Sequence, residues 1–81
     1  MKERFCREYL EDGTLGGFIN IDNIVHVYIS QIQKKKNSFT ILSYCLKCET
    51  VHCDVFRISE EYETEREAEN KMCEMIAWWE E

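Results

Sequence analysis

The chain has 81 residues, 44% of them hydrophobic and 32% charged, with a net charge of −6; this composition is typical of one globular domain and excludes a disordered segment. No apolar run approaches the roughly 18 residues that a membrane-spanning helix needs. The charge is uneven, because residues 60–81 carry nine acidic and two basic residues (−7) and residues 1–59 carry seven acidic and eight basic residues (+1). Nucleic-acid binding requires a basic surface, so we expect no direct contact with nucleic acid and no membrane association.

The N-terminal sequence and the cysteines bear on the compartment. The first thirteen residues, MKERFCREYLEDG, are charged where a signal peptide has its apolar segment. The cysteine count is five, and an odd number fits poorly with a secreted disulfide framework. We therefore expect a cytoplasmic protein with reduced thiols.

In chain order, the first part of the sequence is typical of β-structure. Residues 5–10 (FCREYL) predict an N-terminal strand, and residues 12–17 (DGTLGG) predict a flexible loop. Residues 18–33 alternate apolar and polar side chains as a strand does, with a bulge or tight bend expected at Asp22-Asn23. Residues 34–38 (KKKNS) predict a solvated hairpin loop.

Two further β-rich segments, FTILSYCL and TVHCDVF, are separated by a very short connection. A two-residue turn at Cys48-Glu49 would place Cys45 opposite His52 on one face of the hairpin. The same register would place six mostly apolar side chains on the other face as a core set, namely Leu42, Tyr44, Leu46, Val51, Cys53 and Val55.

The C-terminal segment predicts a helix at about residues 65–79. Thr64 and Glu67 form a capping box at its start. One apolar stripe follows at helical spacing, made of Ala68, Met72, Met75, Ile76 and Trp79. The sequence thus predicts one α+β domain, residues 1–81, with an antiparallel sheet of three to four strands at about residues 3–57 and the helix on one face. We expect the helix to cover the sheet side chains of Val25, Val27, Ile29, Leu42, Leu46, Val51 and Val55.

Residues 45–54 (CLKCETVHCD) are the strongest candidate for a metal site. A C-x2-C pair at a hairpin turn presents two thiolates to a zinc ion in a zinc knuckle, and Cys45, Cys48 and His52 would be the ligands. The second C-x2-C of a zinc ribbon is absent, and Glu49 stands where a knuckle normally has glycine. We therefore expect strand thiols without a metal or cofactor, with a small zinc-binding module as the alternative.

Catalysis is not expected. A nucleophile pair of Cys45 and His52, with Asp54 nearby, would lie on an open sheet that offers neither an oxyanion hole nor a pocket. The DGTLGG loop has neither the spacing of a phosphate-binding loop nor a helix after it. The sequence therefore predicts a binding protein and not an enzyme.

The order FINIDNI, two β-rich segments, and YETEREA before a closing helix carries a family resemblance. It resembles small proteins of Firmicutes and their phages that have a closing Y-x-T-x-x-E-A helix, over roughly residues 17–79. It is similar in looser outline to flagellar FlbD-like proteins, which share an N-x-x-x-I strand followed by a closing helix. Both families usually have Asn-Gly or Asp-Gly at the turn, where Cys48-Glu49 stands here. The phage resemblance implies an effector in the host-cell cytoplasm that works by binding, such as an anti-CRISPR or other anti-defence protein.

The resulting hypothesis is a non-catalytic inhibitor that acts through an acidic helix and an open sheet face. An apolar patch on that sheet face would pair with a second copy in a homodimer, with Tyr28 and Phe56 near its centre. The candidate partner-binding residues are Tyr28, Phe39, Ile41, Phe56, Glu67, Glu69 and Glu74, the three glutamates facing a basic partner. The alternative function is an oligomer that sequesters a small molecule of nucleotide type at a subunit junction.

Overall fold

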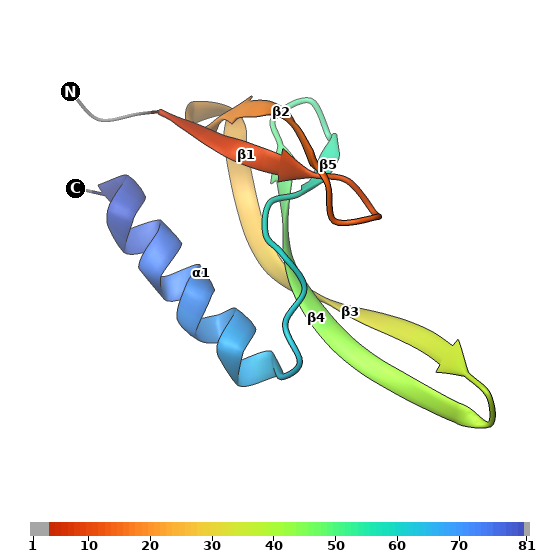
Figure 1. The fold of residues 1–81 in the computed structure, drawn as a ribbon. Coiled ribbons are helices and arrows are strands. Elements are labelled where there is room, and N and C mark those ends of the chain that lie inside the picture. Colours follow the sequence, from red (N-terminus) through yellow and green to blue (C-terminus); the bar gives the residue numbers. More distant parts are fainter. Residues whose placement is uncertain (1–3, 81) are drawn as a thin grey trace.

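Five strands form one antiparallel sheet, and a single helix packs against one of its faces (Figure 1). The computed structural model describes residues 4–80. Its elements are β1 (Phe5–Tyr9), β2 (Leu15–Asn20), the 3-10 turn η1 (Ile21–Asn23), β3 (Ile24–Lys36), β4 (Phe39–Thr50), β5 (Val55–Arg57) and α1 (Glu65–Glu80). The predicted α+β fold is confirmed, with five strands where the sequence predicted three to four. The strand order is β2-β1-β5-β4-β3, so β3 and β2 are the two edges.

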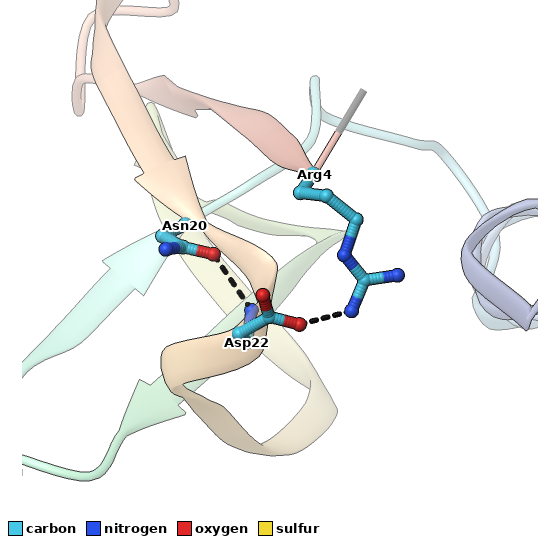
Figure 2. Close-up of polar contacts among 3 residues, drawn as sticks. All are labelled: Arg4, Asn20 and Asp22. Carbon is cyan, nitrogen blue, oxygen red and sulfur yellow. Dashed lines mark hydrogen bonds and ion pairs between the residues drawn. The ribbon is translucent and has the colours of Figure 1, made fainter. Parts of the chain in front are cut away.

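The segment predicted as one long strand is two strands separated by η1. The side chain of Asn20 caps this turn by accepting a hydrogen bond from the backbone N–H of Asp22 at 3.0 Å, and Arg4 forms an ion pair with the Asp22 carboxylate (Figure 2). The side chain of Ile21, the first residue of the turn, is buried. The expected bend at Asp22-Asn23 is therefore confirmed, and it sends β2 to pair with β1 and β3 to pair with β4.

The glycine-rich segment is a loop only in its first half. Gly13 has a φ of +87°, and the Asp12 carboxylate accepts hydrogen bonds from the backbone N–H and the hydroxyl of Thr14 at 3.0 and 2.6 Å. The prediction of a loop is wrong for the second half of the segment, because Gly16 and Gly17 belong to β2. A side chain at Gly16 would lie only 3.0 Å from the Glu8 carboxylate of the neighbouring strand.

The predicted turn at Cys48-Glu49 is wrong. Strand β4 continues through both residues to Thr50, and the chain reverses only at residues 51–54, where Cys53 has a φ of +66°. Local alternation was compatible with either register. The longer one prevails because β3 pairs with β4 along their whole length, and this buries Cys48 opposite Val27. Residues facing each other across the turn therefore differ from the prediction, and β5 pairs Val55 with Glu49.

The core lies between α1 and the sheet. Its buried side chains are Ile19, Leu46, Cys48, Ile58 and Ala68, and Ile24, Val27, Ile29, Tyr44, Phe56, Met72, Met75 and Trp79 pack around them. The predicted helix stripe is thus confirmed, and so is its cap, because the Thr64 hydroxyl accepts a hydrogen bond from the Glu67 N–H at 3.2 Å. The helix is too short and too polar to span a bilayer.

Several expected core residues are exposed instead. Val51 lies in the turn and Val55 faces away from the helix, and their side chains are 54% and 51% exposed. Leu42 is 42% exposed because it belongs to the part of β4 that extends beyond the helix. Cys53 is exposed in the turn as well. A register shift between Ile24 and His26 turns Val25 outward, so that Ile24 packs against the core in its place.

The β3–β4 hairpin extends beyond the helix and the other strands, and residues 31–42 form a projecting arm (Figure 1). The predicted hairpin loop is confirmed only at Asn37-Ser38, where Asn37 has a φ of +59°, because residues 34–36 continue strand β3. The arm gives the molecule extents of 49 × 23 × 20 Å. Backbone hydrogen bonds of 2.8 and 2.7 Å between Tyr44 and Tyr62 hold its base against the segment before α1.

Candidate functional site

The face of the sheet opposite α1, here called the helix-free face, carries the candidate site. The pairs Tyr28–Lys47 and Ser30–Cys45 share this face, because Ile29 and Leu46 between them point toward the helix. A groove of about 600 Å³ is hollowed in it between β1, β5 and the β3–β4 hairpin. Residues from β1, β3, β4 and β5 line this groove. The groove therefore depends on the pairing of these four strands and not on one local motif.

One row of side chains crosses the helix-free face from strand to strand. Tyr9 of β1 is paired with Arg57 of β5, Arg57 with Lys47 of β4, and Lys47 with Tyr28 of β3. We call these four partly buried residues the Tyr–Arg–Lys–Tyr row. Neighbouring strands lie about 4.8 Å apart, so the two cations are direct cross-strand neighbours. Like charges in this position repel and destabilise the sheet.

Within residues 4–80, neither cation of the row is ion-paired to a carboxylate, although the charge of Arg57 helps to lower the pKa of the nearby Glu61 carboxyl. The ion pairs of this part of the chain join Arg4 to Asp22, Lys34 to Glu61 and Lys71 to Glu74. The Nε of Arg57 donates a hydrogen bond to the backbone carbonyl of Ser59 at 2.8 Å, which fixes the guanidinium and leaves its terminal nitrogens free of ion pairs.

Cys45 lies on the floor of the groove beside the row. Its side chain is fully buried. Burial raises the pKa of the Cys45 thiol above its ordinary value, and the positive charges of Arg57 and Lys47 partly offset this effect. The thiol is therefore protonated at neutral pH and supplies an apolar surface to the groove, not a nucleophile.

An ion pair closes the groove where the arm begins. The Nζ of Lys34 lies 2.8 Å from a carboxylate oxygen of Glu61. The hydrogen bond from Lys34 lowers the pKa of the Glu61 carboxyl, which keeps this side chain ionised. The pair connects the arm to the segment that precedes α1.

The structure separates the sheet residues predicted to bind a partner. Tyr28, Phe39 and Ile41 are on the helix-free face, and Phe39 and Ile41 are 73% and 48% exposed. The placement of Phe56 is wrong, because it pairs with Cys48 and packs against the core on the helix side. It cannot form the centre of an interface on the opposite face.

The predicted acidic residues of α1 are exposed but do not form one surface. At 3.6 residues per turn, Glu67 and Glu74 lie on one flank of the helix and Glu69 lies on the other. Lys71 lies between Glu67 and Glu74, with its Nζ 4.0 Å from the Glu74 carboxylate. The helix therefore presents two narrow acidic strips, one of them interrupted by a lysine.

Sequence reasoning missed Tyr9, Lys47 and Arg57. Their positions depend on the pairing of β5 with both β1 and β4, which brings together residues far apart in the chain. The only available signal was that Lys47 alternates with the apolar residues of its strand. That signal marks a surface position without indicating its neighbours.

The proposed zinc ligands do not converge. Cys45 and Cys48 are both buried but point to opposite faces of β4, and His52 is exposed in the turn. The expected Cys45–His52 pairing is wrong, because His52 lies in the turn and β5 pairs with β4 only at Lys47, Cys48 and Glu49. Within residues 4–80, no three His, Cys, Asp or Glu side chains are placed to hold a metal ion.

We therefore predict that removal of metal leaves the fold intact. A structural zinc site contributes roughly 10 kcal/mol or more, so its loss would unfold so small a domain. Far-UV circular dichroism and the melting temperature should be the same before and after dialysis against EDTA. Stoichiometric zinc by elemental analysis, with loss of the dichroism signal in chelator, would contradict this prediction.

Comparison of the chain with protein-family models, with curated proteins and with solved structures finds no match.

Proposed function

We propose that the chain is a non-catalytic binding protein that works as a two-fold dimer. In this dimer the arm of each copy docks on the acidic C-terminal segment of the other. The observation that carries the proposal is the arm itself, which presents exposed Phe39 and Ile41 next to three lysines.

Charge complementarity supports a second copy as the occupant. Residues 31–42 contain Lys34, Lys35 and Lys36 and no acidic residue, whereas residues 60–80 contain eight glutamates against two basic residues. Within one chain, among the described residues, only Lys34 of the three is ion-paired, to Glu61. A two-fold axis lets each arm meet the acidic segment of the other copy, so that both contacts form at once.

Exposed apolar side chains on both surfaces support the same contact. Phe39 on the arm and Trp78 on α1 are 73% and 64% exposed. Exposed aromatic side chains of this size, grouped with charges, are typical of interaction surfaces. So short a chain has a small core, and association adds stability that the monomer cannot supply alone.

The arm variant Phe39→Ser with Ile41→Ser tests the dimer. Each native side chain contributes about 1.5–3 kcal/mol when fully buried, so the double variant should raise the dimer Kd at least about a hundredfold. Light scattering should give twice the 9.8 kDa chain mass for the native protein and the single mass for the variant. The matched control is Leu15→Ser on β2, which removes a side chain that is 53% exposed and should stay dimeric. A monomeric native protein, or a dimeric arm variant, would contradict the proposal.

The second candidate is an inhibitor of the kind that the phage resemblance implies, docking a basic partner through α1. Glu67 and Glu74 favour it, because both are exposed on one flank. A monomeric native mass, together with capture of a basic partner that is lost in Glu67→Lys with Glu74→Lys, would favour this candidate over the dimer.

A further inference from the structure

We infer that the Tyr–Arg–Lys–Tyr row and the groove beside it bind a small organic phosphate that bears hydroxyl groups, with the phosphate between Lys47 and Arg57. The inference goes beyond the proposed dimer and does not depend on it. The four residues of the row come from one chain and lie outside the arm, whereas the groove beside them reaches Ile32 and Lys34 where the arm begins.

The row contains two adjacent cations that are not ion-paired within residues 4–80. Lys47 and Arg57 are direct cross-strand neighbours, and both are partly buried. The charge of Arg57 does act on the Glu61 carboxylate, but Glu61 is already ion-paired to Lys34. This arrangement is unfavourable in the absence of an anion. A bound dianion would reverse the sign of the interaction, since it attracts both cations at once.

The N–H donors of Arg57 and Lys47 have a geometry that suits a phosphate group. The Nε of Arg57 donates a hydrogen bond to the Ser59 carbonyl at 2.8 Å, which holds the plane of the guanidinium. The remaining N–H groups can therefore donate two parallel hydrogen bonds. A guanidinium fork matches two phosphate oxygens, and the ammonium of Lys47 supplies a mobile point charge beside it. Tyr9 and Tyr28 lie at the two ends of the row, and each has a hydroxyl group and an aromatic ring.

The volume and the lining of the groove favour an organic ligand over a bare anion. Its volume of about 600 Å³ is in the range of small-molecule sites, which is roughly 300–1,000 Å³. Its lining includes the partly exposed apolar side chain of Ile32, with the buried Cys45 beneath, and Glu8 and Glu11 lie at the β1 end. Carboxylates there repel phosphate but accept hydrogen bonds from hydroxyl groups, so the phosphate end of a ligand is expected at Lys47 and Arg57 and its hydroxyl groups at the β1 end. A phosphate ester of a sugar or nucleoside fits both requirements.

Titration of the ¹⁵N-labelled native protein with three probes tests the inference, with ADP as the organic phosphate, pyrophosphate as the bare anion and adenosine as the ligand without phosphate. We expect saturable shifts with ADP that centre on the amides of Tyr9, Tyr28, Lys47 and Arg57. Pyrophosphate should give weaker binding at the same amides, and adenosine should give none. Pyrophosphate binding as tightly as ADP would overturn the organic part of the inference. No saturable shift with ADP or pyrophosphate up to about 10 mM, a range that detects millimolar affinity, would overturn all of it.

Matched charge variants locate the site. Lys47→Gln and Arg57→Gln should each weaken ADP binding about tenfold or more, as expected for the loss of a hydrogen bond to a charged group. The control Lys35→Gln removes the same charge from the arm, at a position on the helix side of β3 opposite Thr40, and should bind as the native protein does. Lys47→Gln without ligand should melt at or above the native temperature, because it removes the repulsion with Arg57. Native affinity in Lys47→Gln, or an equal loss in Lys35→Gln, would contradict the site.

The arm variant Phe39→Ser with Ile41→Ser separates this inference from the dimer. Its ADP affinity should equal that of the native protein even when its mass is that of a monomer. A variant that loses both dimerisation and ADP binding would show that the groove needs the second copy, and would overturn the assignment of the site to one chain.

Discussion

Leu46→Ala should lower the free energy of unfolding by about 2–5 kcal/mol, a large part of the roughly 5–15 kcal/mol expected for a small domain. Leu46 is fully buried at the centre of the sheet, where it pairs with Ile29 and lies under α1. Its backbone is fixed on both sides, since its N–H donates to the Ser59 hydroxyl at 2.7 Å and its carbonyl accepts from the Ile58 N–H at 2.9 Å. The surrounding backbone therefore cannot move in to fill the cavity.

The matched control for this prediction is Leu42→Ala on the same strand. Leu42 is 42% exposed, so its truncation should cost about 1 kcal/mol or less. Urea denaturation of both variants, followed by circular dichroism, measures the difference. Equal losses for the two variants would show that Leu42 is buried as well, and would contradict an arm that extends beyond α1.

The second large effect concerns the cysteines. Cys53 and Cys73 are exposed, Cys45 and Cys48 are buried, and Cys6 is partly buried. Burial raises the pKa of the Cys6 thiol to about 11, and burial raises the pKa of the Cys48 thiol as well. Because only the thiolate reacts, these buried thiols should react at least about a hundredfold more slowly than the exposed ones at about pH 8.

Ellman's reagent measures this difference directly. We expect a fast phase of two thiols in the folded protein and release of all five after denaturation in guanidinium. Mass spectrometry of the briefly labelled protein should place the label on Cys53 and Cys73. The variant Cys53→Ser should lose one equivalent of the fast phase, whereas Cys45→Ser should leave it unchanged. Fast labelling of Cys45 would contradict the closed floor of the groove.

The parts of the fold that local patterns determine were predictable. The cap at Thr64 and the apolar spacing of Ala68, Met72 and Trp79 indicate α1, because a helix closes its contacts within a few residues. The alternation of β3 and β4 indicates two strands, and the structure confirms both. The first half of β2 was missed because Gly16 and Gly17 resemble a loop locally, although pairing with β1 keeps them extended.

The register and the candidate site were not predictable in the same way. A turn at Cys48-Glu49 satisfied the alternation of one hairpin, but only the pairing with β3 decides where β4 ends. That one difference moves Phe56 to the core and brings Arg57 next to Lys47. Val55 pairs with Glu49, seven residues from the Leu42 that a turn at Cys48-Glu49 would place opposite it. Because seven is an odd number and side chains alternate with a period of two, this shift exchanges the two faces of β5.

The most direct test of the proposed dimer is an isotope-filtered NOE experiment on an equal mixture of labelled and unlabelled protein, which detects only contacts between copies. We expect intermolecular NOEs from the Phe39 ring and the Ile41 methyl groups to side chains of α1, and their loss in high salt as the lysine–glutamate attraction is screened. Intermolecular NOEs confined to other surfaces, or none at a concentration where light scattering shows a dimer, would contradict the docking of the arm on the acidic segment.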